Sequence, residues 1–280
     1  MLNSTILSYI TFVYFGAFIL YLFMMVMGRE FYGRLATYVS WGGLAAHTVA
    51  VILRWVESYK LEIGHAPFSN LYESLIFFAW TIILLYLIVE WRTKNRTLGA
   101  FVTPLAFLAM AYASFSPNIN SRIQPLIPAL KSNWLISHVI TCFLGYAALG
   151  LSFALSFMYL IKRLDTQKRT NIFLRLIPKK EVLDDLNYQM VVIGFLMLTL
   201  GIITGAVWAH SAWGTYWSWD PKETWSLITW LIYATVLHSR LVRGWKGKKI
   251  AILCFVGFFC VLFTYFGVNY LAGLHSYAKS

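Results

Sequence analysis

The chain has 280 residues, of which 59% are hydrophobic and only 12% are charged, and its formal net charge is +12. Soluble domains carry about 25% charged residues, so this composition excludes an ordinary water-facing surface. The basic residues lie between long apolar runs, which is typical of membrane topology signals and argues against nucleic-acid binding.

A helix needs roughly 20 mostly apolar residues to cross the hydrocarbon core of a bilayer. Apolar runs of about that length recur along the chain, and none shows the period-2 alternation of a barrel strand. We expect spans at 5–27, 35–54, 72–91, 98–115, 136–161, 188–208, 224–240 and 250–271. The predicted fold is all-α: a polytopic transmembrane helix bundle of about eight spans, forming one integral membrane domain over residues 1–280.

The first run has no basic segment before it and no small-residue cleavage site after it, so we expect a retained span rather than a signal peptide. If the N-terminus is outside, 17 of the 23 Lys and Arg residues fall on inside segments. The largest of these is a basic cytoplasmic loop at 162–187, long enough for a short helix. The positive-inside rule therefore predicts that both termini lie outside.

An external segment at 208–225 is unusually rich in tryptophan, with five of the chain's twelve. An aromatic belt at the membrane interface accounts for one or two at a helix end. Five within one short segment, together with Gly214, favour a platform for a flat apolar ring. The five are Trp208, Trp213, Trp217, Trp219 and Trp225.

Two histidines flank this segment on the same predicted side of the membrane. His138 opens the fifth span and His275 follows the eighth, so they could supply the axial nitrogens of a heme iron. Lys222, the one cation of the segment, could pair with a heme propionate or lie among lipid headgroups. The run Asp220-Pro221-Lys222-Glu223 has the pattern of a capping box and predicts the start of the seventh span.

The other histidines are weaker candidates. His238, near the inner end of the seventh span, is a possible ligand or an inner-boundary residue. For His47 a hydrogen bond to a neighbouring helix is favoured over ligation, and His65 is expected to be structural or to line an access route. His210 is left open as a spare ligand, and Asn70 with Glu73 indicates an N-cap of the third span.

The run Trp213-Gly214-x-x-Trp217-x-Trp219-Asp220-Pro221-Lys222-Glu223-Thr224-Trp225 resembles the tryptophan-rich "WWD" signature of heme-handling membrane proteins. Further motifs resemble the CcsA (ResC) family of system II cytochrome c biogenesis. They are Gly64-His65-x-Pro67-x-Ser69-Asn70-Leu71-Tyr72-Glu73-Ser74, Trp134-Leu135-x-x-His138, Ile228-Thr229-Trp230 running to His238, and Gly267-Val268-Asn269-Tyr270 running to His275. The resemblance runs from about residue 40 to the C-terminus.

This resemblance implies a component of a heme exporter and holocytochrome c synthase (heme lyase) that acts with a CcsB/ResB partner. Heme b would be the substrate, attached to the CxxCH cysteines of apocytochrome c. The resemblance makes His138 and His275 axial ligands of external heme and His238 a ligand of a second, in-membrane heme. It also implies a bacterial cytoplasmic or thylakoid membrane, with the heme platform on the outer side. The platform residues would be Trp213, Trp217, Trp219, Asp220, Lys222 and Trp225.

The chain's own cysteines, Cys142, Cys254 and Cys260, lie inside apolar runs and form no CxxC motif, so the reacting thiols must come from the substrate. Two other functions stay open. A b-type electron-transfer subunit would hold heme between His47 and His238, although their depths differ. A small-molecule transporter without heme would be expected to have paired interrupted spans, which the sequence lacks.

Overall fold

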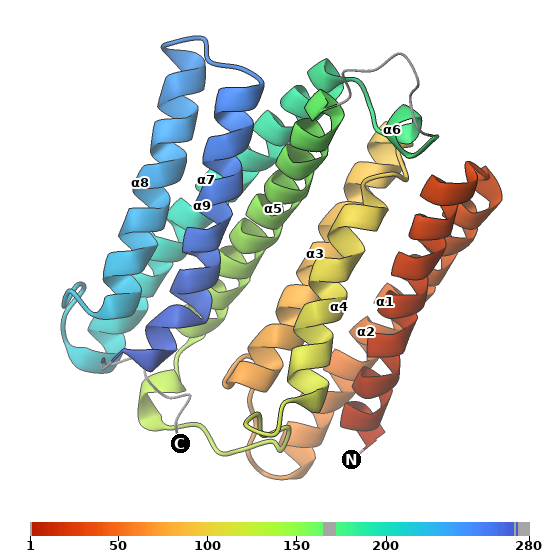
Figure 1. The fold of residues 1–280 in the computed structure, drawn as a ribbon. Coiled ribbons are helices and arrows are strands. Elements are labelled where there is room, and N and C mark those ends of the chain that lie inside the picture. Colours follow the sequence, from red (N-terminus) through yellow and green to blue (C-terminus); the bar gives the residue numbers. More distant parts are fainter. Residues whose placement is uncertain (1, 165–171, 272, 274–280) are drawn as a thin grey trace. The chain divides into compact units, whose positions relative to one another are not determined.

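The computed structural model describes residues 2–164, 172–271 and 273. Over these residues every regular element is helical, with nine α-helices and two short 3-10 helices (Figure 1). The all-α prediction is thus confirmed. The chain forms two compact units, Met1–Pro125 with Met158–Leu183, and Leu126–Phe157 with Asp184–Ser280. The single membrane domain expected from the sequence stays a prediction.

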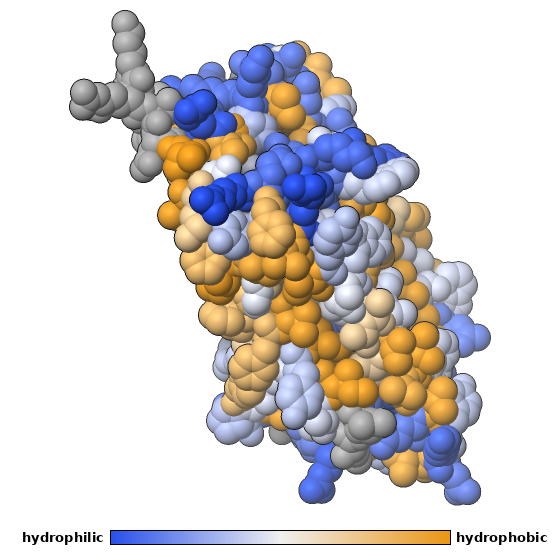
Figure 2. All heavy atoms as spheres, turned by 90° about the vertical axis from the view of Figure 1, so that its right-hand side faces the viewer, coloured by the Kyte–Doolittle hydropathy of each residue, from blue (hydrophilic) through white to orange (hydrophobic). Residues whose placement is uncertain are grey.

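The first unit is built on four long helices: α1 (Leu2–Met27), α2 (Glu30–Lys60), α3 (Leu71–Thr93) and α4 (Gly99–Phe115). Helix α1 packs on α2 and α4, and α3 packs on α4. The short helix α6 (Ile172–Leu176) also belongs to this unit and contacts α1. Figure 2 shows the side on which α1 lies, where hydrophobic side chains cover a broad band between two hydrophilic ends. Such a band suits contact with lipid.

The second unit contains η1 (Pro128–Leu130), most of α5 (Asn133–Leu164) and α7 (Lys180–Trp213), followed by α8 (Pro221–Leu241), α9 (Lys248–Tyr265) and η2 (Gly267–Tyr270). Helices α8 and α9 pack side by side. Helices α5 and α7 meet at glycines: a Cβ built at Gly145 would lie 3.1 Å from the backbone nitrogen of Leu198. Small residues allow membrane helices to approach this closely.

All eight expected spans fall on helices. Within the described residues, six helices are long and apolar enough to cross a membrane: α1, α2, α3, α5, α7 and the segment Lys248–Tyr270 that includes α9. Helix α4 is apolar but has 17 residues, and α8 has 21 residues but is more polar. The protein is therefore an integral membrane protein with a helical bundle, while the side on which its termini lie stays a prediction.

Most helices are longer than the apolar runs that predict them, α4 and α9 being the exceptions. Helix α7 begins at Lys180, inside the expected loop at 162–187, because Glu181 in its first turn complements the positive end of the helix dipole. It continues to Trp213, so the first part of the expected loop at 208–225 is helical. The short helix expected between the fifth and sixth spans is present as α6.

Candidate functional site

The tryptophan-rich segment is folded as a helix end, a short loop and a helix start. Gly214, with φ of +79°, ends α7, since a left-handed residue after the last turn stops a helix and glycine adopts it freely. Helix α8 begins at Pro221. The irregular part is therefore residues 214–220, which we call the Trp loop. It is shorter than the predicted external loop at 208–225.

His138 lies against the backbone of α7. Its Nδ1 is 2.8 Å from the carbonyl oxygen of Gly201 and 3.6 Å from the Sγ atom of Cys142. The ring is near-parallel to the indole of Trp208, with 5.9 Å between centroids and 17° between planes. Because a carbonyl oxygen only accepts, the proton of a neutral His138 sits on Nδ1. The lone pair of Nε2 is then available to a metal ion.

Trp208 connects His138 to the rest of this end of the second unit. The indole is 3% exposed, and its Nε1 donates a hydrogen bond to the carbonyl oxygen of Ala129 in η1, at 2.8 Å. Trp213 packs edge-on against Trp208, with ring centroids 4.9 Å apart. A buried indole whose N–H is satisfied is held rigidly. Trp208 thus gives His138 and Trp213 a rigid ring to pack against.

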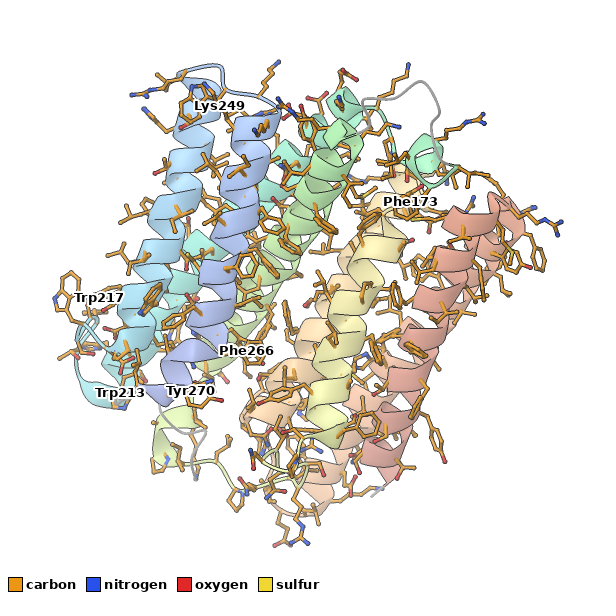
Figure 3. All side chains as sticks on the ribbon, in the orientation of Figure 1. Phe173, Trp213, Trp217, Lys249, Phe266 and Tyr270 are labelled. Carbon is orange, nitrogen blue, oxygen red and sulfur yellow. The ribbon has the colours of Figure 1, made fainter. Side chains whose placement is uncertain are left out.

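The Trp loop presents aromatic rings at the surface. Trp219 is 69% exposed and meets Trp217 edge-on at 5.7 Å, while Tyr216 stacks on His210 at 4.2 Å. Figure 3 shows Trp213 and Trp217 at one end of the second unit and Lys249 at the opposite end. Exposed aromatic rings at one end of a membrane bundle provide a surface on which a flat apolar molecule can stack.

The predicted capping box at the start of α8 is confirmed. The Oδ1 atom of Asp220 accepts from the backbone N–H of Lys222 at 2.8 Å, and the box with Glu223 is complete in both directions. The Oε2 atom of Glu223 also accepts from the backbone N–H of Ser218, at 2.7 Å. Since the loop backbone is tied to the helix start, these two carboxylates set the shape of the Trp loop.

Lys222 is partly buried although it follows an exposed loop. Burial lowers the pKa of its ammonium group, whereas the neighbouring carboxylate of Asp220 raises it. Among the described residues, Nζ of Lys222 makes no hydrogen bond or ion pair, so it can receive an anionic group.

Trp225, another predicted site residue, lies at the margin of this cluster. Trp225 packs against Phe263 of α9, with 4.1 Å between ring centroids, and so holds α8 to α9 rather than joining the exposed rings. His275 lies outside the described residues. Gly273 is described, and a Cβ built there would lie 2.9 Å from Cδ of Pro221 and also touch Asp220. Gly273 therefore lies beside the start of α8.

His238 lies in the last turn of α8, away from the Trp loop, and is exposed. Close to it Arg240 forms a 2.7 Å ion pair with Asp184 of α7, whose other carboxylate oxygen accepts from the backbone N–H of Gly247 at 2.8 Å. These contacts fix the turn between α8 and α9. Within the part of the chain that the structure describes, none of these contacts involves His238, which lies on the helix surface.

The remaining histidines belong to the first unit and are hydrogen bonded. His47 is buried, and its Nδ1 is 3.1 Å from the hydroxyl of Tyr14, which confirms the expected bond between helices. His65 has one ring nitrogen 2.8 Å from the carbonyl oxygen of Ala66 and the other 3.0 Å from that of Gln124. A ring engaged at both nitrogens is structural, which agrees with one of the two roles expected for His65.

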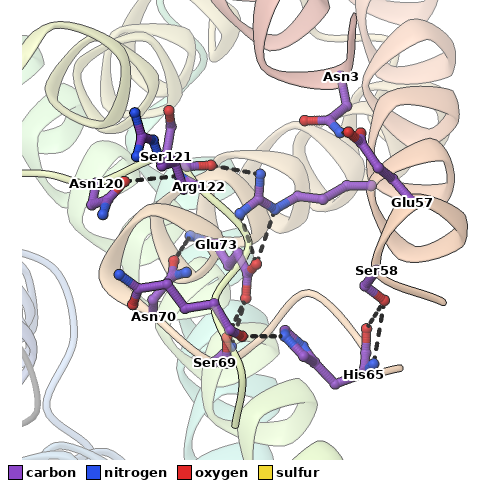
Figure 4. A network of polar contacts seen from close by, with 12 residues as sticks. Asn3, Glu57, Ser58, His65, Ser69, Asn70, Glu73, Asn120, Ser121 and Arg122 are labelled. Atoms are coloured by element: carbon purple, nitrogen blue, oxygen red, sulfur yellow. Dashed lines mark hydrogen bonds and ion pairs between the residues drawn. The ribbon is translucent and has the colours of Figure 1, made fainter. Parts of the chain in front are cut away.

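The motif at residues 64–74 forms a buried polar network at one end of the first unit (Figure 4). Arg54 and Glu73 make an ion pair of 2.9 Å, and their side chains are 1% and 0% exposed. Arg54 also donates to the carbonyl oxygen of Ser121, and Glu73 accepts from Ser69, each at 2.8 to 2.9 Å. Asn70 caps α3 as predicted by accepting from the backbone N–H of Glu73 at 2.9 Å. The motif therefore has a structural role in the first unit, where it joins α2, the start of α3 and the segment around Ser121.

Three contributors to these sites were not predicted from the sequence. Gly201 and Gly205 contact Cys142 and His138 with their backbone, and Arg54 is the partner of Glu73. The spacing of Gly201, Gly205 and Trp208 along one helix face could have pointed to a close helix contact. Of the cysteines, Cys142 and Cys254 are buried as expected, whereas Cys260 is partly exposed.

The sequence profile of the family described as "Cytochrome C assembly protein" matches residues 68–275. The chain is 42% identical over 262 residues to "Cytochrome c biogenesis protein CcsA" of Guillardia theta, covering 86% of this chain and 85% of that protein. It is 44% identical over 255 residues to the protein of the same name in Prochlorococcus marinus, covering 82% and 79%.

Among solved structures, the fold is similar to that of "Cytochrome c Heme Lyase CcmF". The TM-score is 0.68 at 17% sequence identity, over 94% of this chain and 46% of that one. This chain thus spans less than half the length of that protein, and at this identity the likeness concerns the fold alone.

Proposed function

Because this chain belongs to the cytochrome c assembly protein family, we propose that it holds heme at the outer face of a membrane for covalent attachment to an apocytochrome c. Its role in cytochrome c assembly follows from the family membership itself. The placing of heme on particular residues is our proposal. The observation that carries it is the His138 ring, whose Nδ1 faces the Gly201 carbonyl and whose plane follows the buried Trp208 beside the Trp loop.

Two nitrogens complete the axial coordination in this proposal. His138 supplies Nε2 from α5, and His275 supplies the second nitrogen from the segment after η2. The contact of Gly273 with Asp220 and Pro221 supports this arrangement, because it brings the chain to the Trp loop two residues before His275. Imidazole pairs are common axial ligands of heme iron.

The other predicted site residues have different roles in this proposal. Trp213, Trp217 and Trp219 form the aromatic surface on which the macrocycle stacks. Lys222 pairs with a propionate. Among the described residues, Asp220 is the one carboxylate near its ammonium group, and the two form no ion pair. Asp220 and Trp225 have structural roles. Asp220 caps the start of α8, and Trp225 packs α8 against Phe263 of α9.

The chemistry at this site requires two accessible thiols, whereas Cys142, the cysteine beside His138, is a single buried thiol. Each thioether forms by addition of a thiol S–H across a vinyl C=C of heme b, with no leaving group and no net transfer of electrons. Cys142 and Cys254 are buried, so the two thiols belong to the CxxCH segment of the apocytochrome. The chain then binds and orients heme, and the fixed nitrogens hold the iron until a substrate histidine replaces one of them.

A second heme position belongs to the same proposal. His238 is exposed on α8, and its ring has no hydrogen bond among the described residues, so a CcsB/ResB-type partner subunit can provide the opposite ligand. The membrane would be a bacterial cytoplasmic membrane or a thylakoid membrane, with the Trp loop on the outer side.

The test is co-expression with a CcsB-type partner, purification in mild detergent, and an absorption spectrum with a pyridine hemochrome assay. We expect bound heme in the wild type, loss or a changed spectrum in His138→Ala and in His275→Ala, and no holocytochrome from either variant. Arg122→Met, an exposed residue of the first unit, is the control and should keep the spectrum.

A complex that folds but binds no heme would overturn the proposal. Heme that persists unchanged in the double variant His138→Ala, His275→Ala would move the site to His238 and favour a b-type electron-transfer subunit.

A further inference from the structure

The His138 ring lies along one face of α7 that is formed by Gly201, Gly205 and Trp208. These residues are spaced by four and three positions, so they project from the same side of the helix. The Nδ1 atom of His138 is 2.8 Å from the Gly201 carbonyl oxygen, and the ring plane is within 17° of the Trp208 indole. Helix α7 thus contacts the imidazole twice: its Gly201 carbonyl oxygen accepts from Nδ1, and its Trp208 indole lies nearly parallel to the ring.

This approach requires glycine at two positions. A Cβ built on Gly205 would lie 2.7 Å from Nδ1 and 2.8 Å from Cε1 of His138, closer than such carbons are found. A Cβ built on Gly201 would lie 2.6 Å from Sγ of Cys142. Any side chain at 205 therefore pushes the imidazole away from the helix and lengthens its bond to the Gly201 carbonyl.

We infer that Gly205, together with the carbonyl group of Gly201, positions His138 as a neutral imidazole protonated on Nδ1 that binds iron through Nε2. The inference rests on the proposed function. A hydrogen bond from the second ring nitrogen fixes the tautomer and orientation of a metal-ligating histidine and raises its basicity. Here the acceptor is a helix carbonyl on a packed backbone, so the ligand geometry is set by α5–α7 packing rather than by a carboxylate.

The test uses Gly205→Ala in the full chain with its CcsB-type partner. Loss of such a supporting contact typically weakens metal binding by about 10–100-fold, so we expect weaker heme retention of that order. The low-spin spectrum of two nitrogen ligands should also shift, and added imidazole should restore it, because imidazole can replace a displaced His138.

The matched control is Gly194→Ala on the same helix. A Cβ at Gly194 meets Cδ2 of Leu149 at 2.5 Å, so it disturbs the same pair of helices away from His138. We expect its heme spectrum and heme affinity to match those of the wild type. Equal loss of heme in Gly194→Ala and Gly205→Ala would show that helix packing alone is responsible and would overturn the inference.

A measurement on the wild type covers the case in which Gly205→Ala does not fold. Solid-state NMR of the complex labelled with ¹⁵N-histidine, with His138→Ala used to assign the signal, reports which ring nitrogen of heme-free His138 carries the proton. We expect Nδ1, and a proton on Nε2 would overturn the inference.

The two proposals fail separately. If His138→Ala loses heme while a folded Gly205→Ala keeps the wild-type spectrum and affinity, the positioning role is wrong and the proposed function stands. If His138→Ala itself binds heme as the wild type does, the proposed function is wrong at this site.

Discussion

Asp184 and Asp185, adjacent in α7, both contact Arg240 of α8, yet they do so in different surroundings. Asp184 is 2.7 Å from the guanidinium with its side chain 9% exposed, whereas Asp185 is 3.4 Å away and 71% exposed. Asp184 also accepts from the backbone of Gly247. The same arginine thus forms one buried ion pair and one exposed ion pair, and it lies at the end of the helix that carries His238.

Asp184→Ala should therefore destabilise the protein strongly. Removing one partner of a buried pair typically costs about 3–5 kcal/mol, because the other charge is left without compensation. Thermal unfolding of the purified protein should show a clear fall in Tm. Asp185→Ala is the control, and we expect almost no change since exposed pairs contribute little. Equal effects of the two variants would contradict the distinction.

Arg54 and Glu73 make the corresponding test in the first unit. Arg54→Met leaves a buried carboxylate unpaired, and the expected loss of unfolding free energy is again about 3–5 kcal/mol. The double variant with Glu73→Gln should be more stable than Arg54→Met alone, because no unpaired charge remains buried. Thermal unfolding measures both, with exposed Arg122→Met as the control. A double variant less stable than the single one would refute this account.

Asp220 allows its structural role to be separated from its charge. Asp220→Asn keeps an oxygen that accepts from the N–H of Lys222, and asparagine is about as good an N-cap as aspartate. Asp220→Ala loses the cap, which typically costs about 0.5–2 kcal/mol. We expect Asp220→Asn to retain wild-type Tm and heme spectrum, and Asp220→Ala to lose stability. Loss of heme in a stable Asp220→Asn variant would instead show that the charge itself is needed.

Trp208→Phe keeps a ring beside His138 but removes the N–H that bonds to Ala129. We expect the free energy of unfolding to fall by about 1 kcal/mol, because the hydrogen bond is lost. We also expect a weakened heme spectrum, because the ring that packs against His138 and Trp213 is less rigidly held. Absorption spectra and thermal unfolding measure the two effects. Trp219→Phe, at an exposed position, should leave Tm unchanged. A Trp208→Phe variant with unaltered Tm would argue against this anchoring role.

The sequence by itself determined the helical class, the approximate location of the eight longest helices and the start of two of them. These features are local: apolar length decides whether a helix can cross lipid, and Asp220 and Asn70 cap the residues that directly follow them. It also predicted that tryptophans gather beside His138, since residues on the same side of successive spans share one end of a bundle. Helix ends were misplaced because polar residues can extend a helix beyond its apolar run.

Only the tertiary structure decided which residues support the site. The Gly201 carbonyl and His138 are 63 residues apart, and Asp184 and Arg240 are 56 apart. The spacing of Gly201 and Gly205 indicates a close helix contact, but only the packing shows that Gly205 clears space for an imidazole, whereas Gly42 has open space around it. Such partnerships arise when two helices pack at one particular register, because a carbonyl or a missing side chain acquires its role only from what the packing places against it.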